Sequence, residues 1–392
     1  MVKQRQFLLL FICSLVTWWV GIGLMPLLPI YAATLGATPT MVGMFLSFSF
    51  FTLALGTASA AWLARKLPRR TWLLALLSLV GAAISFLLGM ATQLWQLVLL
   101  VAMIWFIGGV SLVLLGVLTG LAATVHERGR IFGLLAASSA LAGVIGGLVM
   151  GPTAERWGYP ALFALIAATF LLQGVLALLI DEPAAPLAST PQGKHGQQPG
   201  RLSRVVIVLL AANVCYSIGS FVAGMGRSLA MDQAGFGISA ISLVAGAGSA
   251  AGLIGMPLFG RLSDGGNRLT MLALTYALGV LALVGMVYAS SLATFLVVAA
   301  LMAAAGAERA VAGALVTDLA PPGALDRYMA RFDTARWAAG IVGFAGAGYG
   351  VELLGLPATL LLGALLTGVS IVLLIVASRS ASQPAAVSQP LS

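Results

Sequence analysis

Two adjacent charged residues, Glu308 and Arg309, stand inside a long apolar stretch of the sequence. If that stretch crosses a lipid bilayer as a helix, an ionised side chain near its middle costs about 2.5–3.5 kcal/mol, so such residues indicate a function. Neighbouring helical residues point about 100° apart, so a salt bridge between these two does not explain them. We expect Glu308 to face a cavity, where its carboxyl group can carry a proton. Arg309 either binds an anionic group or bridges two helices.

A polar stripe lies in another apolar stretch. Its members recur at spacings of three and four residues and therefore share one helix face: Asn213, Ser217, Ser220, Gly224 and Arg227. Such a face suits the wall of a cavity that water reaches. The alternative is close packing of small residues, with the arginine extending to the membrane surface.

Aromatic residues and a second charged pair could complete a site. Trp18 and Trp105 either line a pocket for bulky amphipathic compounds or fill ordinary packing positions. Asp333 and Arg336 are spaced i, i+3 near the end of a predicted helix. We interpret them as a structural pair or a gate.

The elements that position these residues are membrane helices. The 392 residues are 60% hydrophobic and 8% charged, with a mean hydropathy of +1.06, which excludes an ordinary soluble domain. Apolar stretches of about 20 residues are long enough to cross a bilayer as helices. We predict an all-α membrane protein with transmembrane helices at twelve places: 7–30, 41–63, 71–91, 95–124, 131–153, 160–180, 204–229, 239–259, 269–290, 293–318, 328–350 and 358–378.

Basic residues occur mainly in alternate breaks between these stretches. If the N-terminus is cytoplasmic, 16 of the 20 Lys and Arg residues fall on the cytoplasmic side, and Arg156 is in an external loop. The positive-inside rule then places both termini in the cytoplasm. The net charge of +9 reflects this topology and indicates no nucleic-acid partner. Cys13 and Cys215 have no metal-binding or redox spacing.

A polar segment divides the chain in the middle. Residues 181–203 are rich in Pro, Gly, Gln and Ser, which predicts a flexible cytoplasmic linker. It separates an N-terminal six-helix bundle, 1–180, from a C-terminal six-helix bundle, 204–379. The segment 380–392 has a similar composition and is predicted to be a disordered cytoplasmic tail.

The two bundles repeat each other in sequence. An offset of 199 places Gly36 on Gly235, and an offset of 197 places Glu155 on Glu352 and Gly158 on Gly355. Two pseudo-symmetric bundles with a site at their interface are the expected layout of a transporter that rocks one bundle against the other.

Four segments carry a family resemblance. The first helix ends in Gly21-Ile-Gly23-Leu-Met-Pro26, and the eighth is followed by Gly260-Arg-Leu-Ser-Asp264-Gly-Gly-Asn-Arg268. The first-half copy of that loop, Ala61 to Arg70, is degenerate, and the fifth helix carries Gly143, Gly146, Gly147 and Gly151-Pro152. Together these segments resemble the major facilitator superfamily, and its drug-efflux antiporters in particular, over nearly the whole chain.

The resemblance implies roles for several residues. Asp264 would cap a helix end and pair with basic residues such as Arg268, which closes the bundles on the cytoplasmic side. The segment with Gly147, Gly151 and Pro152 would let helices approach closely and bend the external end. At two positions this sequence differs from the family pattern, so the family's residue roles do not apply there. Arg65 stands where the first-half loop usually has an Asp, and Ile104 stands where proton-driven efflux members carry an Arg.

We therefore expect a secondary active transporter that exports small amphipathic compounds by alternating access, with protons as the coupling ion and Glu308 as their carrier. The alternative is a permease or uptake carrier for an anionic metabolite that Arg227 and Arg309 hold. A membrane sensor or enzyme is the third hypothesis, disfavoured because catalytic residues do not cluster and no sizeable soluble domain is present. We expect no cofactor or metal, a monomer, and a place in a bacterial inner or plasma membrane.

Overall fold

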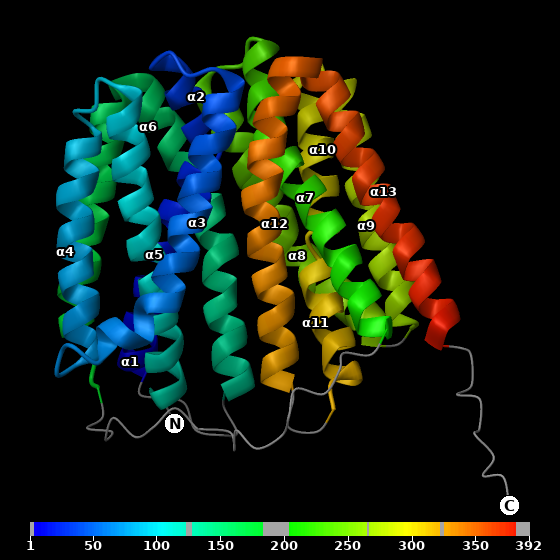
Figure 1. Cartoon of the computed structure of the whole chain (residues 1–392). Helices are drawn as coiled ribbons and strands as arrows, with labels where there is room; N and C mark the ends of the chain where they lie inside the picture. Colours follow the sequence, from blue (N-terminus) through cyan, green and yellow to red (C-terminus); the bar gives the residue numbers. More distant parts are fainter. Residues whose placement is uncertain (1–3, 123–127, 183–203, 265, 322–324, 382–392) are drawn as a thin grey trace, which may run out of the picture.

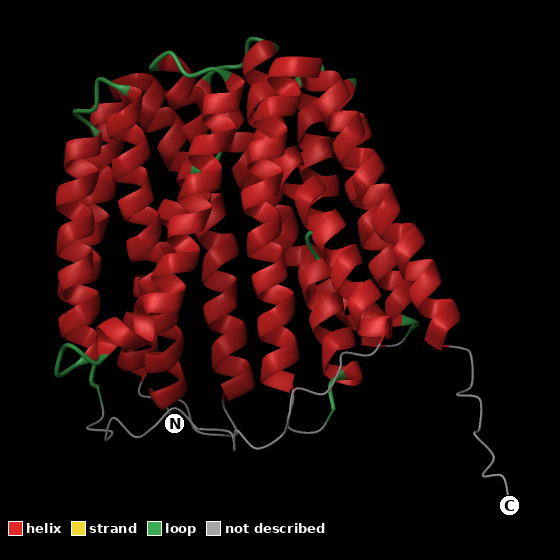
Figure 2. Cartoon of the chain, viewed as in Figure 1, coloured by secondary structure: helices red, strands yellow, loops and turns green. Residues whose placement is uncertain are grey.

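A computed structural model describes residues 4–122, 128–182, 204–264, 266–321 and 325–381. These residues form helices joined by short turns, without a strand among them (Figure 2). The helices stand side by side, and the start of α1 and the end of α13 lie at the same end of the molecule (Figure 1). We call that end the lower end, and the opposite one the upper end. The prediction of an all-α membrane fold is confirmed.

The helices fall into two groups by chain order. The N-terminal half contains α1 (Gln4–Trp18), η1 (Trp19–Gly23), α2 (Leu28–Thr34), α3 (Pro39–Ala64), α4 (Arg70–Leu88), α5 (Leu94–Ala122) and α6 (Arg128–Leu178). The C-terminal half contains α7 (Arg204–Gln233), α8 (Ile238–Asp264), α9 (Arg268–Val287), α10 (Leu292–Ala305), α11 (Glu308–Leu319), α12 (Leu325–Leu354) and α13 (Leu356–Ala381). The predicted linker lies outside the described residues except for Asp181 and Glu182, as does the predicted tail after Ala381.

Eleven stretches of the described helices are long and apolar enough to cross a membrane. One of them belongs to α6, whose 51 residues would extend for about 75 Å, far beyond the roughly 30 Å of a bilayer core. Gly158 within α6 has φ 80° and ψ 169°, which are not helical angles. The chain therefore turns there, and α6 holds both the fifth and the sixth predicted helices. The chain reverses at Gly158, and Pro152 lies inside the helix that precedes this turn.

The internal repeat is visible in the backbone. Among the described residues, four glycines have positive φ angles: Gly36 (83°), Gly158 (80°), Gly235 (79°) and Gly355 (82°). They are the two pairs that the sequence offsets matched. Only glycine adopts this conformation without strain, so the two halves turn the chain at equivalent points by the same means.

The first predicted helix is not continuous. A π-helical segment, η1, follows α1, and a turn precedes α2, whose first turn contains Pro29. Proline donates no backbone hydrogen bond, so Pro26 and Pro29 interrupt the regular ladder. This irregular backbone is where the chain borders the cavity described below.

The tenth predicted helix is also interrupted. It divides at Gly306 and Ala307 into α10 and α11, so Glu308 stands in the first turn of α11. The Tyr216 hydroxyl donates a 2.7 Å hydrogen bond to the Ala305 carbonyl at the end of α10. That bond satisfies an acceptor at a helix end inside the protein.

Candidate functional site

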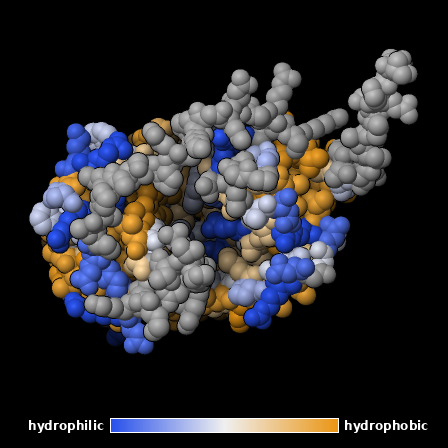
Figure 3. All heavy atoms as spheres, turned by 90° about the horizontal axis from the view of Figure 1, so that it is seen from below, coloured by the Kyte–Doolittle hydropathy of each residue, from blue (hydrophilic) through white to orange (hydrophobic). Residues whose placement is uncertain are grey.

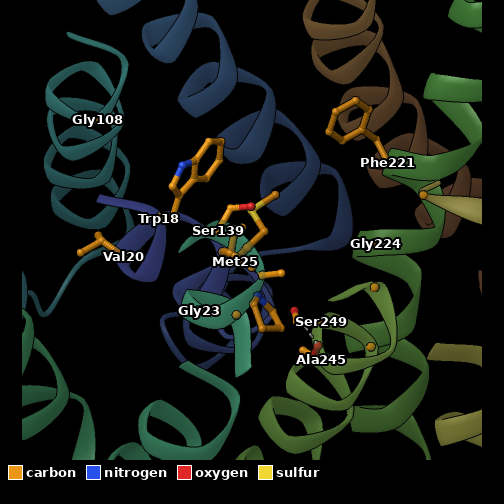
Figure 4. A pocket seen from close by; sticks show the side chains of 18 of the residues that line it. Trp18, Val20, Gly23, Met25, Gly108, Ser139, Phe221, Gly224, Ala245 and Ser249 are labelled. Atoms are coloured by element: carbon orange, nitrogen blue, oxygen red, sulfur yellow. Dashed lines mark hydrogen bonds between the residues drawn. The ribbon is translucent and has the colours of Figure 1, made fainter. Parts of the chain in front are cut away.

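A cavity of about 480 Å³ lies between the two halves. Its wall comes from both, and it includes the irregular segment around Gly23 and Met25 on one side and Phe221 and Gly224 of α7 on the other (Figure 4). The predicted residues Trp18, Trp105, Ser220, Arg227 and Arg309 line it, and so does Gly147. This volume is within the range of sites for drug-sized ligands.

Aromatic side chains from both halves meet at the cavity wall. Phe50 of α3 contacts three rings of the other half, with centroid distances of 5.1 Å to Phe221, 5.0 Å to Phe344 and 5.7 Å to Trp337. All four residues line the cavity. The sequence analysis did not select this aromatic cluster. Helix α3 is apolar on every side, so its pattern did not show that Phe50, rather than its phenylalanine neighbours, faces inward.

Above this cluster, α3 packs closely against α12. A β carbon added to Gly43 would lie 2.4 Å from the Phe344 carbonyl oxygen and 2.8 Å from the Gly348 α carbon. Ser47 donates a 2.6 Å hydrogen bond to the Ile341 carbonyl. Such close contact between helices requires residues with little or no side chain.

The second contact between the halves, α6 with α8, is built in the same way. A β carbon added to Gly147 would lie 2.5 Å from the Gly246 α carbon. The Gly151 amide donates a 3.2 Å hydrogen bond to the Ser242 hydroxyl. Gly147 and Gly151 were predicted to matter for close helix packing, and both lie at this contact.

A carboxylate closes the upper end of each contact. Glu352 Oε2 accepts a 2.9 Å hydrogen bond from the backbone amide of Thr40, in the first turn of α3. Glu155 Oε2 accepts a 2.8 Å bond from the amide of Ser239, in the first turn of α8. Free amides and the helix dipole favour an anion at these positions. The sequence offset matched Glu155 with Glu352, but it did not show that each would cap a helix of the opposite half.

The two halves separate toward the lower end. Among the described residues of α3 below Phe50 and of α8 below Ser249, no hydrogen bond or ring contact reaches the opposite half. Seen from below, the surface is hollowed between the halves, and hydrophilic side chains lie in the hollow (Figure 3). The cavity is thus closed above and accessible from the lower end.

Two arginines give the cavity a positive wall. Arg227 and Arg309 are the charged residues that line it, and no Asp or Glu of the described residues does so. The Nε of Arg227 is buried and has no hydrogen-bond partner among the described residues. Arg309 is exposed where it borders the cavity, and Glu308, Asp333 and Arg336 lie near enough to interact with it electrostatically.

Glu308 does not face the cavity as we expected. Its side chain is 0% exposed, and Arg336 Nη2 donates to both of its carboxylate oxygens at 2.9 Å. Two such bonds to one carboxylate are strong, because both partners are charged. Arg336 therefore pairs with Glu308 across α11 and α12, and not with Asp333 of its own helix, which is exposed. Sequence spacing within one helix could not show a partner on another.

The polar stripe of α7 divides between two environments. Ser220, Gly224 and Arg227 line the cavity, whereas Asn213 and Ser217 are buried and do not. The Asn213 side chain donates a 3.1 Å hydrogen bond to the Phe332 carbonyl of α12. The lower part of the stripe thus joins helices within the C-terminal half.

The loop that resembled the family signature acts within one half in this structure. Arg268 lies 2.9 Å from Asp318 of α11 and 3.9 Å from Asp264. Asn267, and not Asp264, caps α9, because its side chain accepts from the Leu269 and Thr270 amides at 2.9 and 3.4 Å. Asp264 is exposed at the end of α8.

Comparisons with known proteins identify the family to which this sequence and fold correspond. The family model of the Major Facilitator Superfamily matches residues 8–264 and 207–390. A search of curated proteins gave no significant match.

Solved structures share the fold at low sequence identity. A mutant of the nucleoside transporter NupG has a TM-score of 0.80 at 13% identity, covering 95% of this chain and 99% of that one. A POT family transporter in complex with 5-aminolevulinic acid has a TM-score of 0.76 at 14% identity, covering 97% of each chain. An inward-facing, unoccupied bacterial homolog of the human lysosomal transporter Spinster has a TM-score of 0.71 at 14% identity, covering 97% and 96%.

The family match spans both halves, and the fold agrees with transporters of this architecture. This chain is an integral, multi-pass membrane protein that belongs to the Major Facilitator Superfamily.

Proposed function

We propose that this protein is a secondary active transporter that exports small amphipathic compounds by alternating access, with proton uptake driving the export. The observation that carries the proposal is the cavity between two halves that touch at one end only. Rocking one half against the other would close the lower end and open the upper end around the same cavity. With the termini in the cytoplasm, the present state faces inward.

The cavity wall favours amphipathic compounds. Trp18, Trp105, Phe50, Phe221 and Trp337 offer large apolar surfaces. Met25 and Met302 also line the cavity, and flexible thioether side chains adapt to ligands of different shape. The few polar groups between them can orient a ligand without matching every part of it.

For the proton step we propose Glu308. It is a fully buried carboxylate, and its charge holds Arg336 and thereby joins α11 to α12. Protonation would remove that charge and free Arg336, so the two helices could shift relative to each other. Because Glu308 is closed off here, its proton would enter or leave in another conformation, and the chain break at Gly306 and Ala307 is the place where α11 can move.

A second candidate keeps the fold and changes the substrate. The two cavity arginines, with no carboxylate beside them on the wall, favour a carrier for an anionic metabolite. Under that hypothesis, neutralising Arg227 and Arg309 abolishes transport of carboxylates only. Under the efflux hypothesis, neutralising Arg309 would change the transport of neutral and cationic compounds as well.

The test is transport into proteoliposomes under an imposed pH gradient, with cationic, neutral and anionic aromatic compounds. We expect the parent protein to accumulate at least one class against its gradient. Glu308→Gln should lose uphill transport but keep exchange of substrate across the membrane. Asp232→Asn, which changes an exposed carboxylate at the upper end of α7, is the matched control. If Glu308→Gln accumulates substrate as well as the parent does, the proton-carrier role is wrong.

A further inference from the structure

We infer that Arg227 binds an oxyanion group of the substrate at the closed upper end of the cavity, so that the substrate is an amphipathic organic anion held with its charged group uppermost. This inference rests on the proposed transport function, and it names the substrate class and its orientation.

The first step is that the buried Nε of Arg227 has no hydrogen-bond partner, and the guanidinium no ion pair, among the described residues. The ion pairs of the described residues use other arginines, namely Arg70, Arg268 and Arg336. The nearest acid along α7, Asp232, is five residues away, which places it on a different face of the helix, and it is exposed. A guanidinium group without a counter-charge inside a membrane protein has a high desolvation free energy. A bound anion would balance its charge.

The second step is its position. Helices α7 and α10 run in opposite directions and touch where Tyr216 meets Ala305. From that point, Arg227 lies about 16 Å toward the upper end, and Arg309 lies about 6 Å toward the lower end, at about 1.5 Å per helical residue. A compound that enters from below meets Arg309 first and reaches Arg227 last. Helical side chains lean toward the N-terminus of their helix, so both arginines incline into the space between them.

The third step is the room beside Arg227. Gly224 stands one turn below it on the same face of α7 and lines the cavity, and a β carbon added there would meet nothing within 4 Å. Gly252 of α8 also lines the cavity, and a β carbon added there would meet nothing within 4 Å. These glycines do not serve close packing, unlike Gly43 or Gly147. They leave a passage along which an anionic group can approach the guanidinium fork, which suits carboxylates and phosphates.

The fourth step is what surrounds the rest of the ligand. Trp18, Trp105 and Phe221 line the cavity with apolar surface. A substrate whose oxyanion contacts Arg227 would therefore place its apolar part among these rings.

The experiment compares three probes with one aromatic body: 2-naphthoate, 2-naphthalenemethanol and 2-naphthylmethylammonium. Binding to the purified full chain is measured by thermal stabilisation and by titration calorimetry. We expect 2-naphthoate to bind the parent about tenfold or more tightly than the alcohol, since hydrogen bonds to charged groups contribute at least that much. Arg227→Gln should remove the difference by weakening the binding of 2-naphthoate. Arg227→Lys, which keeps the charge and loses the fork, should be intermediate.

Two further variants keep the result interpretable. Arg156→Gln removes an exposed arginine that contacts Trp157 outside the cavity, and it should preserve the preference for the anion. Gly224→Leu leaves Arg227 in place but fills the approach to it, and it should weaken naphthoate binding even if Arg227→Gln does not fold.

The inference is overturned if the parent does not distinguish the anion from the alcohol, or if Arg227→Gln retains the full preference. A different result would contradict the proposed transport function. If the parent moves none of the three compounds in exchange assays, the protein is not a carrier for such substrates. If Arg227→Gln still exchanges the alcohol or the amine, the proposed transport function is retained. The binding data for 2-naphthoate then decide whether Arg227 recognises anions.

Discussion

Thr40 donates its backbone amide to Glu352 at 2.9 Å, although 312 positions of sequence separate the two residues. The equivalent bond from Ser239 to Glu155 joins the halves at the other contact. Each half thus supplies one carboxylate and one helix start. Two related hydrogen bonds between side chain and backbone hold the upper end, and no Lys or Arg of the described residues pairs with either carboxylate.

Removing both carboxylates should open the upper end. In the double variant Glu155→Ala, Glu352→Ala, the first turns of α3 and α8 lose an acceptor for their amides, and we expect the outward-open population to increase several-fold. Spin labels at Met90 and Tyr288, both exposed near the upper end, report the distance by electron resonance in a Cys13→Ala, Cys215→Ala background. Arg156→Ala, at the same end, should leave the distance distribution unchanged. An unchanged distribution in the double variant would show that the caps do not hold this end.

Substitutions of Glu308 and Arg336 should have non-additive effects on the free energy of unfolding. Replacing Arg336 by Met leaves a fully buried carboxylate without its partner, which is expected to cost about 3–5 kcal/mol. The double variant Glu308→Leu, Arg336→Met should recover most of that loss, because no charge remains buried. Unfolding in detergent, followed as a double-mutant cycle, measures the coupling. Additive losses would mean that the pair contributes nothing beyond its two separate side chains.

Glycines on the cavity wall should differ from glycines that face lipid. Gly108 of α5 lines the cavity, and a β carbon there meets nothing within 4 Å. Gly108→Leu should fold normally and reduce transport strongly by filling the space beside Trp105. Gly346 of α12 is equally free of contacts but is exposed and does not line the cavity. Gly346→Leu should therefore transport like the parent, and equal losses in both would argue against this cavity as the substrate path.

The loop after α8 offers a separate test. Asn267→Ala removes the cap of α9 and should cost about 1 kcal/mol of stability. Asp264→Asn changes an exposed side chain 3.9 Å from Arg268 and should leave the unfolding midpoint of this state nearly unchanged. A larger loss for Asp264→Asn than for Asn267→Ala would reverse this assignment of the cap.

Composition and the length of the apolar stretches were sufficient to predict membrane helices, because both follow from the energetics of crossing a bilayer. The orientation derived from the basic residues stays a prediction. The offsets between the halves also matched Gly158 with Gly355, and the structure shows that both have positive φ angles. The face of each helix that points toward the protein interior was harder to predict. In α3 all faces are apolar, some toward lipid and some toward protein, so the inward position of Phe50 left no polar signal.

Contacts between distant helices were the other limit. Glu308 stood out in the sequence as an acid inside an apolar stretch. Its partner Arg336 is on another helix, so the pair depends on how α11 packs against α12. The interruption before Glu308 was also missed. Its only local sign was Gly306, and glycine is common in membrane helices.

The solitary guanidinium of Arg227 has a consequence for the transport cycle. When the cavity holds no ligand, the transition from one orientation to the other must carry an uncompensated charge through a more enclosed state. With an anion aboard, that charge is balanced. The reorientation of the empty transporter should thus be the slow step of the cycle. The exchange of labelled for unlabelled substrate across the membrane should therefore be faster than net efflux from loaded vesicles.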